Sequence, residues 1–297
     1  MATRLAVAAC ALLAACAAAP PAAAPDLAGR IWDVRGRQFS DERVLVLRMR
    51  AARYVLLGEA HDNPAHHALR AGLLGELAQG TDVYFEQFDL PRDAALREAQ
   101  LAGAGADALA SAGRMDPSWR WPLYRPLIEA ALAAKLPVRA ANLPSADARR
   151  IAAAGVLAPG DAALAGALAH SGWSEVLEQV LRAEIIESHC KALPERAAPA
   201  MALAQRARDA AMALALAAAP GNAVLLAGNG HVRRDLGVPR YLPQGAAVLS
   251  VAFLEVREDE PGPQAYARGA ADAPEYDFIW FTDRQPRADP CEAFRKR

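Results

Sequence analysis

Two segments of the chain place a histidine just beyond an apolar run and a glycine. The run 54–57 is followed by Gly-Glu-Ala-His, which brings Glu59 and His61 to its end, and the run 223–227 is followed by Gly-Asn-Gly-His231. Both runs are typical of buried strands. Because side chains alternate along an extended chain, Glu59 and His61 point to the same side. The sequence therefore predicts polar groups at the ends of two core strands.

A second carboxylate joins this set. Glu86 lies inside the apolar segment 82–88, where an unpaired charge is costly to bury, so we expect it to have a partner. Ligands of open α/β sheets bind beyond the carboxyl ends of the strands. We therefore expect one polar cluster with four members: Glu59, His61, Glu86 and His231.

Two chemistries suit such a cluster. Carboxylates and imidazoles together can ligate a divalent metal and activate water. Alternatively, a glutamate can orient a histidine as the general base of a hydrolase that uses no metal. The spacing does not decide between them. A third interpretation is an envelope scaffold in which the cluster only stabilises the sheet.

Strands and helices alternate around the cluster, which predicts an α/β fold with a mostly parallel sheet and helices on both faces. The main domain is expected over 29–285, followed by a C-terminal tail over 286–297. Residues from about 160 to 220 have an almost entirely helical pattern. We expect them to form a helical insert subdomain beside the sheet.

The first 16 residues resemble a bacterial lipoprotein signal peptide. A short cationic start precedes the apolar run 5–15, which is too short to span a bilayer. The run ends at Leu-Ala-Ala-Cys16, which resembles a lipobox whose cysteine is acylated; Cys10 is a weaker candidate. The alternative is an ordinary signal peptide that is cleaved near Ala24.

The segment after Cys16 predicts where the protein is found. Residues 17–28 begin with alanine and proline alone and are expected to form an extended tether. Ala17 directly after the acylated cysteine favours an outer-membrane lipoprotein of the bacterial cell envelope, facing the periplasm or the surface. In an oxidising compartment Cys190 and Cys291 can form a disulfide, although spacing alone cannot exclude two free or metal-binding thiols.

The overall charge excludes one class of partner. The formal net charge is -1, with 54% hydrophobic and 23% charged residues. This is an ordinary globular balance, without the basic excess of a nucleic-acid-binding protein. We therefore expect no nucleic-acid partner.

Several motifs resemble one family. The segment 57–67, Leu-Gly-Glu-Ala-His-Asp-Asn-Pro-Ala-His-His, resembles the opening motif of the ChaN-like haem-binding lipoproteins, and so does the strand that carries Glu86. Further similar segments are 121–141, 204–213 and 226–239. The resemblance covers about residues 30–254. The family belongs to a wider group with Tiki proteases, TraB-like proteins and erythromycin esterases.

The resemblance implies a haem-binding protein linked to iron uptake. In the closer family a tyrosine ligates the iron, and the haems meet at a homodimer interface. In the wider group the same polar cluster is catalytic, so a hydrolase remains the alternative function. Whether the protein is an enzyme therefore stays open.

The tyrosine that we expect as iron ligand is Tyr124. Ferric iron favours a phenolate oxygen, and a porphyrin needs an apolar, aromatic surface. Tyr124 lies close to Trp121, Arg120 and Arg125, and arginines can meet the propionates. The alternative is that Trp121 and Tyr124 pack the following helix against the sheet.

Two further predictions concern helical residues. Four residues at helical spacing share one helix face: Gln205, Arg208, Asp209 and Met212. The resemblance implies that this face lines the cleft or contacts the His231 loop. We expect His66 and His67 to lie on the exposed surface of their helix.

Overall fold

The computed structural model describes residues 26–158, 161–260, 262–270, 273–289 and 291–292. The predicted signal peptide over 1–16, the lipidation at Cys16 and most of the tether lie outside these residues.

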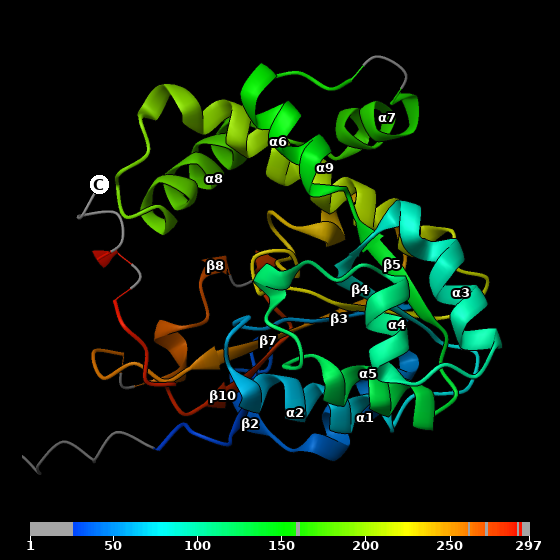
Figure 1. Ribbon diagram of the computed structural model, residues 1–297. Helices are drawn as coiled ribbons and strands as arrows, with labels where there is room; N and C mark the ends of the chain where they lie inside the picture. The colour runs from blue at the N-terminus through cyan, green and yellow to red at the C-terminus, as the bar shows by residue number, and fades with distance from the viewer. Residues whose placement is uncertain (1–25, 159–160, 261, 271–272, 290, 293–297) are drawn as a thin grey trace, which may run out of the picture.

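One eight-stranded sheet organises the molecule, in the order β2-β1-β10-β7-β3-β6-β4-β5 (Figure 1). The strands from β10 to β5 are parallel, whereas β1 is antiparallel to both of its neighbours. The mostly parallel sheet that the sequence predicts is therefore confirmed. The strands are β1 Ile31–Asp33, β2 Gln38–Ser40, β3 Tyr54–Leu57, β4 Asp82–Asp89, β5 Val138–Asn142, β6 Ala223–Leu226, β7 Val248–Glu255 and β10 Phe278–Thr282, with β8 Gly269–Ala270 and β9 Ala273–Pro274 as a separate pair.

Helices cover both faces of this sheet, as Figure 1 shows. Helices α1 to α5 pack against one face: α1 Glu42–Ala51, α2 Pro64–Leu74, α3 Asp93–Leu101, α4 Ala106–Ala112 and α5 Arg125–Ala133. Helices α6, α7 and α9 pack against the other, and α8 packs on α9: α6 Ser145–Ala154, α7 Ala162–His170, α8 Glu175–Ser188 and α9 Ala198–Ala217. Short 3-10 helices are η1 Leu90–Arg92, η2 Pro117–Trp119, η3 Glu195–Ala197, η4 Val238–Tyr241 and η5 Pro263–Ala265.

Strand β3 shows why the core has two halves. All four of its side chains are buried. Val55 and Leu57 pack with the α1–α5 layer, whereas Tyr54 and Leu56 pack with the α9 layer. This follows from the alternation of side chains along a strand that is covered on both faces.

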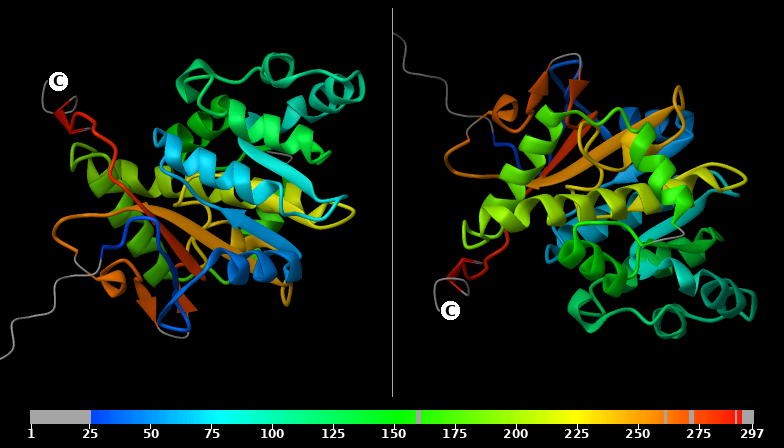
Figure 2. Two further views of the ribbon diagram at one scale, coloured as in Figure 1. Left: turned by 90° about the horizontal axis from the view of Figure 1, so that it is seen from below. Right: turned by 90° about the horizontal axis from the view of Figure 1, so that it is seen from above.

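The helical segment from α7 to α9 lies above the sheet, and α9 crosses the sheet when seen from above (Figure 2). The buried side of α9 consists largely of alanines, and these small side chains let the helix approach the strands closely. Within the described ranges, no helix is long and apolar enough to cross a membrane.

A disulfide between Cys190 and Cys291 ties the turn after α8 to the C-terminal segment, with 5.5 Å between the Cα atoms. In Figure 1 this segment, in red, rises from the end of β10 toward α8.

Loss of this disulfide should lower stability moderately. A disulfide stabilises mainly by restricting the unfolded chain, and we expect about 2–4 kcal/mol here because the bond joins cysteines 101 positions apart and so closes a long loop. Thermal unfolding of the wild type with and without reductant measures the effect. The Cys190→Ser variant should unfold at the lower temperature and no longer respond to reductant; a response in that variant would contradict the prediction.

Candidate functional site

The loops that follow β3 and β6 lie side by side at the carboxyl edge of the sheet, because these two strands are parallel neighbours. The amide of Asn229 donates to the carbonyl of Glu59 at 3.0 Å, which ties one loop to the other. Glu86 reaches the same edge from β4, on the other side of β6, and its carboxylate accepts from the amide of Gly228 at 2.8 Å. The four predicted cluster residues are therefore brought together, in two adjoining groups.

The two glycines of the repeated motif are required by close packing. A Cβ atom on Gly58 would lie 2.1 Å from Oδ1 of Asn229 and 2.9 Å from Cγ2 of Val232. A Cβ atom on Gly228 would lie 2.9 Å from Cε1 of His61. Each glycine thus lets one loop touch the other, which is a packing reason for the repeated Gly-x-x-His pattern.

Glu59 is the centre of the first group, and its side chain is fully buried. Its Oε1 accepts from the hydroxyl of Tyr124 at 2.7 Å and from Nδ1 of His61 at 2.7 Å, with Nε2 of Gln87 at 3.5 Å. Its Oε2 forms an ion pair with the guanidinium of Arg70. The buried carboxylate is therefore neutralised by one cation and held by several donors.

Helix α2 supplies the buried cation. Asn63 caps the helix by accepting from the amide of Ala65 at 2.9 Å, and Pro64 occupies its first turn. The helix then directs His67 and Arg70 inward, and the two bond to each other at 3.0 Å. Burial lowers the pKa of Arg70 to about 9, while Tyr124 and Glu86 oppose the shift, so the guanidinium stays charged at neutral pH.

The predicted surface positions of His66 and His67 are wrong, because both residues are completely buried. His66 accepts from the amide of Ala60 at 2.9 Å, and its Nε2 bonds to Thr282 at 2.8 Å. Burial lowers its pKa to about 4, so it is neutral. Nε2 of His67 donates to the carbonyl of His61 at 3.0 Å. Both histidines thus fix the loop that carries Glu59 and His61.

His61 is the exposed member of the first group, with 48% of its side chain accessible. Because a carboxylate only accepts hydrogen bonds, the contact with Glu59 places the ring proton on Nδ1 and leaves the lone pair on Nε2. Burial of part of the ring lowers the pKa of His61, although Glu86 opposes the shift. Its ring meets Trp119 edge to face at 4.9 Å between centroids. His61 therefore presents a neutral, oriented imidazole.

His231 has the opposite environment and is only 7% exposed. Its Nδ1 lies 2.6 Å from Asp209 Oδ1 and its Nε2 lies 3.3 Å from Glu86 Oε1. Burial lowers its affinity for a proton, but the two carboxylates outweigh burial and raise its pKa to about 10. Burial likewise opposes the charge on Glu86, yet His231, His61 and the Gly228 amide lower its pKa to about 2. His231 is thus an imidazolium that joins two strands to α9.

Contact with the His231 loop was one of two roles expected for four residues of α9, and two of the four make it. Asp209 and Gln205 both reach Nδ1 of His231, the latter at 3.2 Å. Arg208 instead donates to Oδ1 of Asn142 at 2.9 Å, and Met212 is buried in the core.

The sequence did not reveal three residues that contact the first group: Arg70, His67 and Gln87. The burial of Arg70 could have been predicted from helical spacing, because Leu73 and Leu74, three and four residues later, are apolar and share its face of the helix.

The pH dependence of stability should report the His231 group. Its folded pKa of about 10 exceeds the ordinary 6.5, so its contribution is fully present below pH 6.5 and is lost as the pH rises through 10. We expect the stability advantage of the wild type over His231→Gln to shrink across this interval. Urea unfolding at pH 6, 8 and 10 measures it. An advantage that is constant with pH would contradict an ionised His231.

The cluster does not have the arrangement of a metal centre. Among the residues that the structure describes, no group of three or more His, Cys, Asp or Glu side chains could hold a metal ion. Glu59 is engaged by Arg70 and Tyr124, and His231 uses both ring nitrogens on carboxylates. The divalent metal that the sequence allowed at this cluster thus has no set of ligands here.

The aromatic segment before α5 is divided between core and surface. Tyr124 is completely buried, and its hydroxyl donates to Glu59. Trp121 donates to Asp107 at 3.1 Å, and Arg125 pairs with the same carboxylate. Arg120 is 62% exposed and has one long ion pair, with Asp62 at 3.8 Å. Tyr124 therefore does not present its oxygen at the surface. Arg120, beside the loop that carries His61, does present its guanidinium there.

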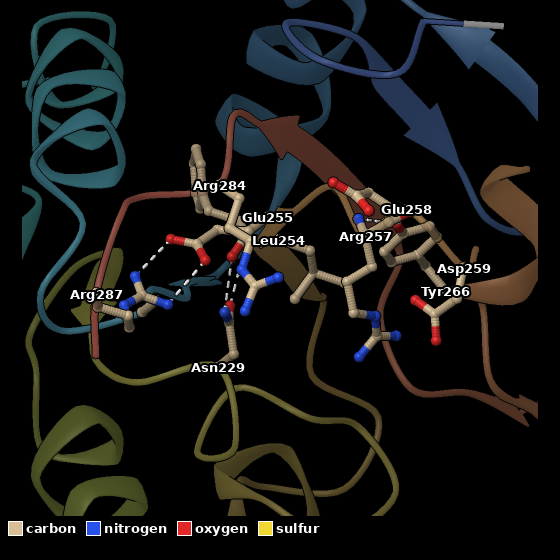
Figure 3. A pocket seen from close by; sticks show the side chains of 11 residues that line it. Asn229, Leu254, Glu255, Arg257, Glu258, Asp259, Tyr266, Arg284 and Arg287 are labelled. Carbon is tan, nitrogen blue, oxygen red and sulfur yellow. Dashed lines mark hydrogen bonds and ion pairs between the residues drawn. The ribbon is translucent and has the colours of Figure 1, made fainter. Parts of the chain in front are cut away.

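A pocket of about 520 Å³ opens at the same edge, beside Ala60 and Asn229. Its walls come from the end of β7, the loop after it and the C-terminal segment. Figure 3 shows Arg287 reaching across to Glu255, to which it donates at 2.6 and 2.8 Å. Arg287 also pairs with Asp62 at 2.9 Å, directly after His61. The pocket is therefore walled largely by charged groups, and Ala60, the residue before His61, belongs to its lining.

Comparison with known proteins agrees with this architecture. Residues 45–242 match a family model described as "Haem-binding uptake, Tiki superfamily, ChaN". The structure "Cofacial heme binding to ChaN of Campylobacter jejuni" is similar, with a TM-score of 0.68 and 19% identity over 84% of this chain and 95% of that one. A mutant erythromycin esterase, EreC, in its open conformation gives a TM-score of 0.43 and 15% identity over 77% of this chain and 76% of that one. No curated protein matches. Because the family model covers two thirds of the sequence, the chain belongs to the ChaN family of haem-binding uptake proteins in the Tiki superfamily.

Proposed function

We propose that this protein is a lipid-anchored haem-binding protein of the bacterial envelope that serves iron acquisition. The observation that carries the proposal is the match of the haem-binding family model over residues 45–242. The fold likeness to the ChaN protein of Campylobacter jejuni, whose structure is described as binding cofacial heme, supports it.

The carboxyl edge of the sheet has groups that suit a haem. His61 offers a ring nitrogen, and Trp119 gives an aromatic surface beside it. Arg120 supplies an exposed guanidinium for a propionate. When bound, the haem iron would supply the reducible metal centre that the protein carries.

Hemin titration of the purified full chain tests the proposal. We expect a saturable shift of the hemin absorption band, with a defined stoichiometry. Sedimentation of the same samples measures whether the loaded protein forms the homodimer that the family resemblance implies. Thermally unfolded protein is the control. If the native protein causes only the weak, unsaturable change of the hemin absorption band that the unfolded protein causes, haem binding is refuted.

The lipid anchor has its own test. In bacteria fed a labelled fatty acid, the wild-type chain should become labelled and should fractionate with the outer membrane. The Cys16→Ser variant should lose the label, while Cys10→Ser should retain it. Labelling that survives Cys16→Ser would refute this anchor without affecting haem binding.

One observation favours a hydrolase as the second candidate. Glu59 orients a partly exposed His61 whose lowered pKa keeps it neutral, as a general base requires. His231 is charged and enclosed, so the base would be His61. Hydrolysis of an activated ester such as p-nitrophenyl acetate should then be lost in His61→Ala. Equal rates for wild type and variant would exclude this candidate.

A further inference from the structure

A second cavity of about 300 Å³ lies between α8, α9 and the loop that follows β6. It shares no lining residue with the pocket beside Ala60, and neither haem binding nor the alternative hydrolase uses it. Its apolar wall consists of Leu181, Ile185 and Leu236, which are buried, and Met201, which is partly buried. The cavity therefore has a surface that suits the hydrocarbon part of a ligand.

One polar wall of the cavity carries more negative than positive charge. Arg233 and Glu184 line it, and their side chains form an ion pair. The same guanidinium also pairs with Asp235 at 2.6 Å and with Glu275 at 3.1 Å. Three carboxylates thus share one guanidinium. Because a single cation neutralises only one of them, this wall attracts a further positive charge.

Asp209 adds a carboxylate with a free oxygen. The residue lines the cavity and is only 2% exposed. Its Oδ1 is bonded to His231 at 2.6 Å, whereas its Oδ2 accepts no hydrogen bond from the described residues and keeps some accessible surface. The next residue, Arg208, donates to Asn142 instead. Burial raises the pKa of Asp209 to about 6, although His231 opposes the shift, so the carboxylate is mainly ionised at pH 7.5.

We propose that this cavity binds a small primary amine with an aliphatic body. The ammonium donates to Oδ2 of Asp209, and the charge of Glu184, whose side chain is 43% exposed, adds to the attraction. The aliphatic body lies against the wall that contains Leu181, Ile185 and Met201. An anionic ligand of the same shape meets an excess of carboxylates, and a neutral one brings no charge to Oδ2.

Methionine methyl NMR of the purified full chain tests the proposal at pH 7.5, with n-hexylamine as the probe. This amine is protonated at that pH. Met201 lies in the wall of the cavity, whereas Met49, on α1 at the other face of the sheet, is buried and serves as the internal control. We expect a saturable shift of the Met201 signal and no shift of the Met49 signal. The variant Met201→Leu assigns the signal.

The charge of the ligand is varied with the wild-type protein alone. 1-Hexanol and hexanoate have the same chain length without a positive charge, and each should bind at least about tenfold more weakly, because hydrogen bonds between charged groups are the stronger ones. Nα-acetyl-lysine methylamide carries the same ammonium on a peptide unit. It should also bind more weakly than n-hexylamine, because its two amide groups would lose water against the apolar wall.

Two variants locate the charge that is recognised. Asp209→Asn replaces the carboxylate by a neutral amide whose oxygen can still accept from His231, and it should weaken n-hexylamine binding about tenfold. Glu98→Gln is the matched control. Glu98 is an exposed carboxylate on α3, so its replacement changes the net charge equally and should leave the affinity as in the wild type.

The outcomes that would overturn the proposal are distinct. Equal binding of n-hexylamine and 1-hexanol would exclude recognition of the ammonium, and this comparison requires no variant to fold. A Met201 signal that does not shift, or equal losses in Asp209→Asn and Glu98→Gln, would exclude this cavity as the site. Tighter binding of the lysine derivative would exclude a free small amine as the ligand. A failed hemin titration would not affect the amine site, because the two arguments share no residue.

Discussion

Replacement of Arg70 by methionine should lower the free energy of unfolding by about 3–5 kcal/mol, the usual cost of removing one partner of a buried ion pair. The side chain of Arg70 has no exposed surface, and neither has that of Glu59. Without the guanidinium, the Glu59 carboxylate would keep only neutral donors in a region that water does not reach. Urea unfolding at pH 7 measures the loss.

A double replacement controls for this explanation. If the penalty comes from an uncompensated charge, Glu59→Gln in the Arg70→Met background should recover much of it, because an amide can still accept from Tyr124 and His61. Arg50→Met is a matched single control. Arg50 pairs with Glu76 at the surface, with both side chains about half exposed, so its loss should cost at most about 1 kcal/mol. Additive losses in the double variant would contradict the buried-charge argument.

The repeated Gly-x-x-His motif shows how far the sequence could be read. Its glycines and its position at strand ends predicted two loops that meet, and the structure confirms that arrangement. The two histidines nevertheless have opposite environments. His61 is half exposed beside one carboxylate, whereas His231 is enclosed by Glu86 and Asp209. The difference comes from α9, which covers the second loop, and no local pattern encodes where that helix packs.

The fold was easier to predict than the site for the same physical reason. Strand–helix alternation and apolar runs are local signals, and they were sufficient for the mostly parallel sheet and its helical faces. Arg70 and Tyr124 depend on long-range contacts with Glu59, eleven and 65 positions away. An arginine and two adjacent histidines on a helix usually indicate an exposed face. Here the buried Glu59 reverses that expectation, because it provides a charge for the arginine to neutralise.

The Gly58→Ala substitution should have the second large effect, a loss of about 3 kcal/mol or more in unfolding free energy. The added Cβ would lie 2.1 Å from Oδ1 of Asn229. Asn229 cannot easily move, because its side chain accepts from the amide of Phe253 at 3.1 Å and donates to the carbonyl of the same residue at 2.7 Å. Overpacking costs about 1–3 kcal/mol, and each buried hydrogen bond that breaks adds about 1–3 kcal/mol.

Gly230→Ala is the matched control in the facing loop. A Cβ atom there has no neighbour within 4 Å, and the residue is exposed, so stability should change by no more than about 0.5 kcal/mol. Thermal and urea unfolding of the two variants compare the costs directly. Because Asn229 lies in the loop between Gly228 and His231, Gly58→Ala should also disturb the contact between Gly228 and His61 and weaken hemin binding. Equal stabilities for Gly58→Ala and Gly230→Ala would show that the two loops can separate, and would remove the packing reason for the first glycine of the motif.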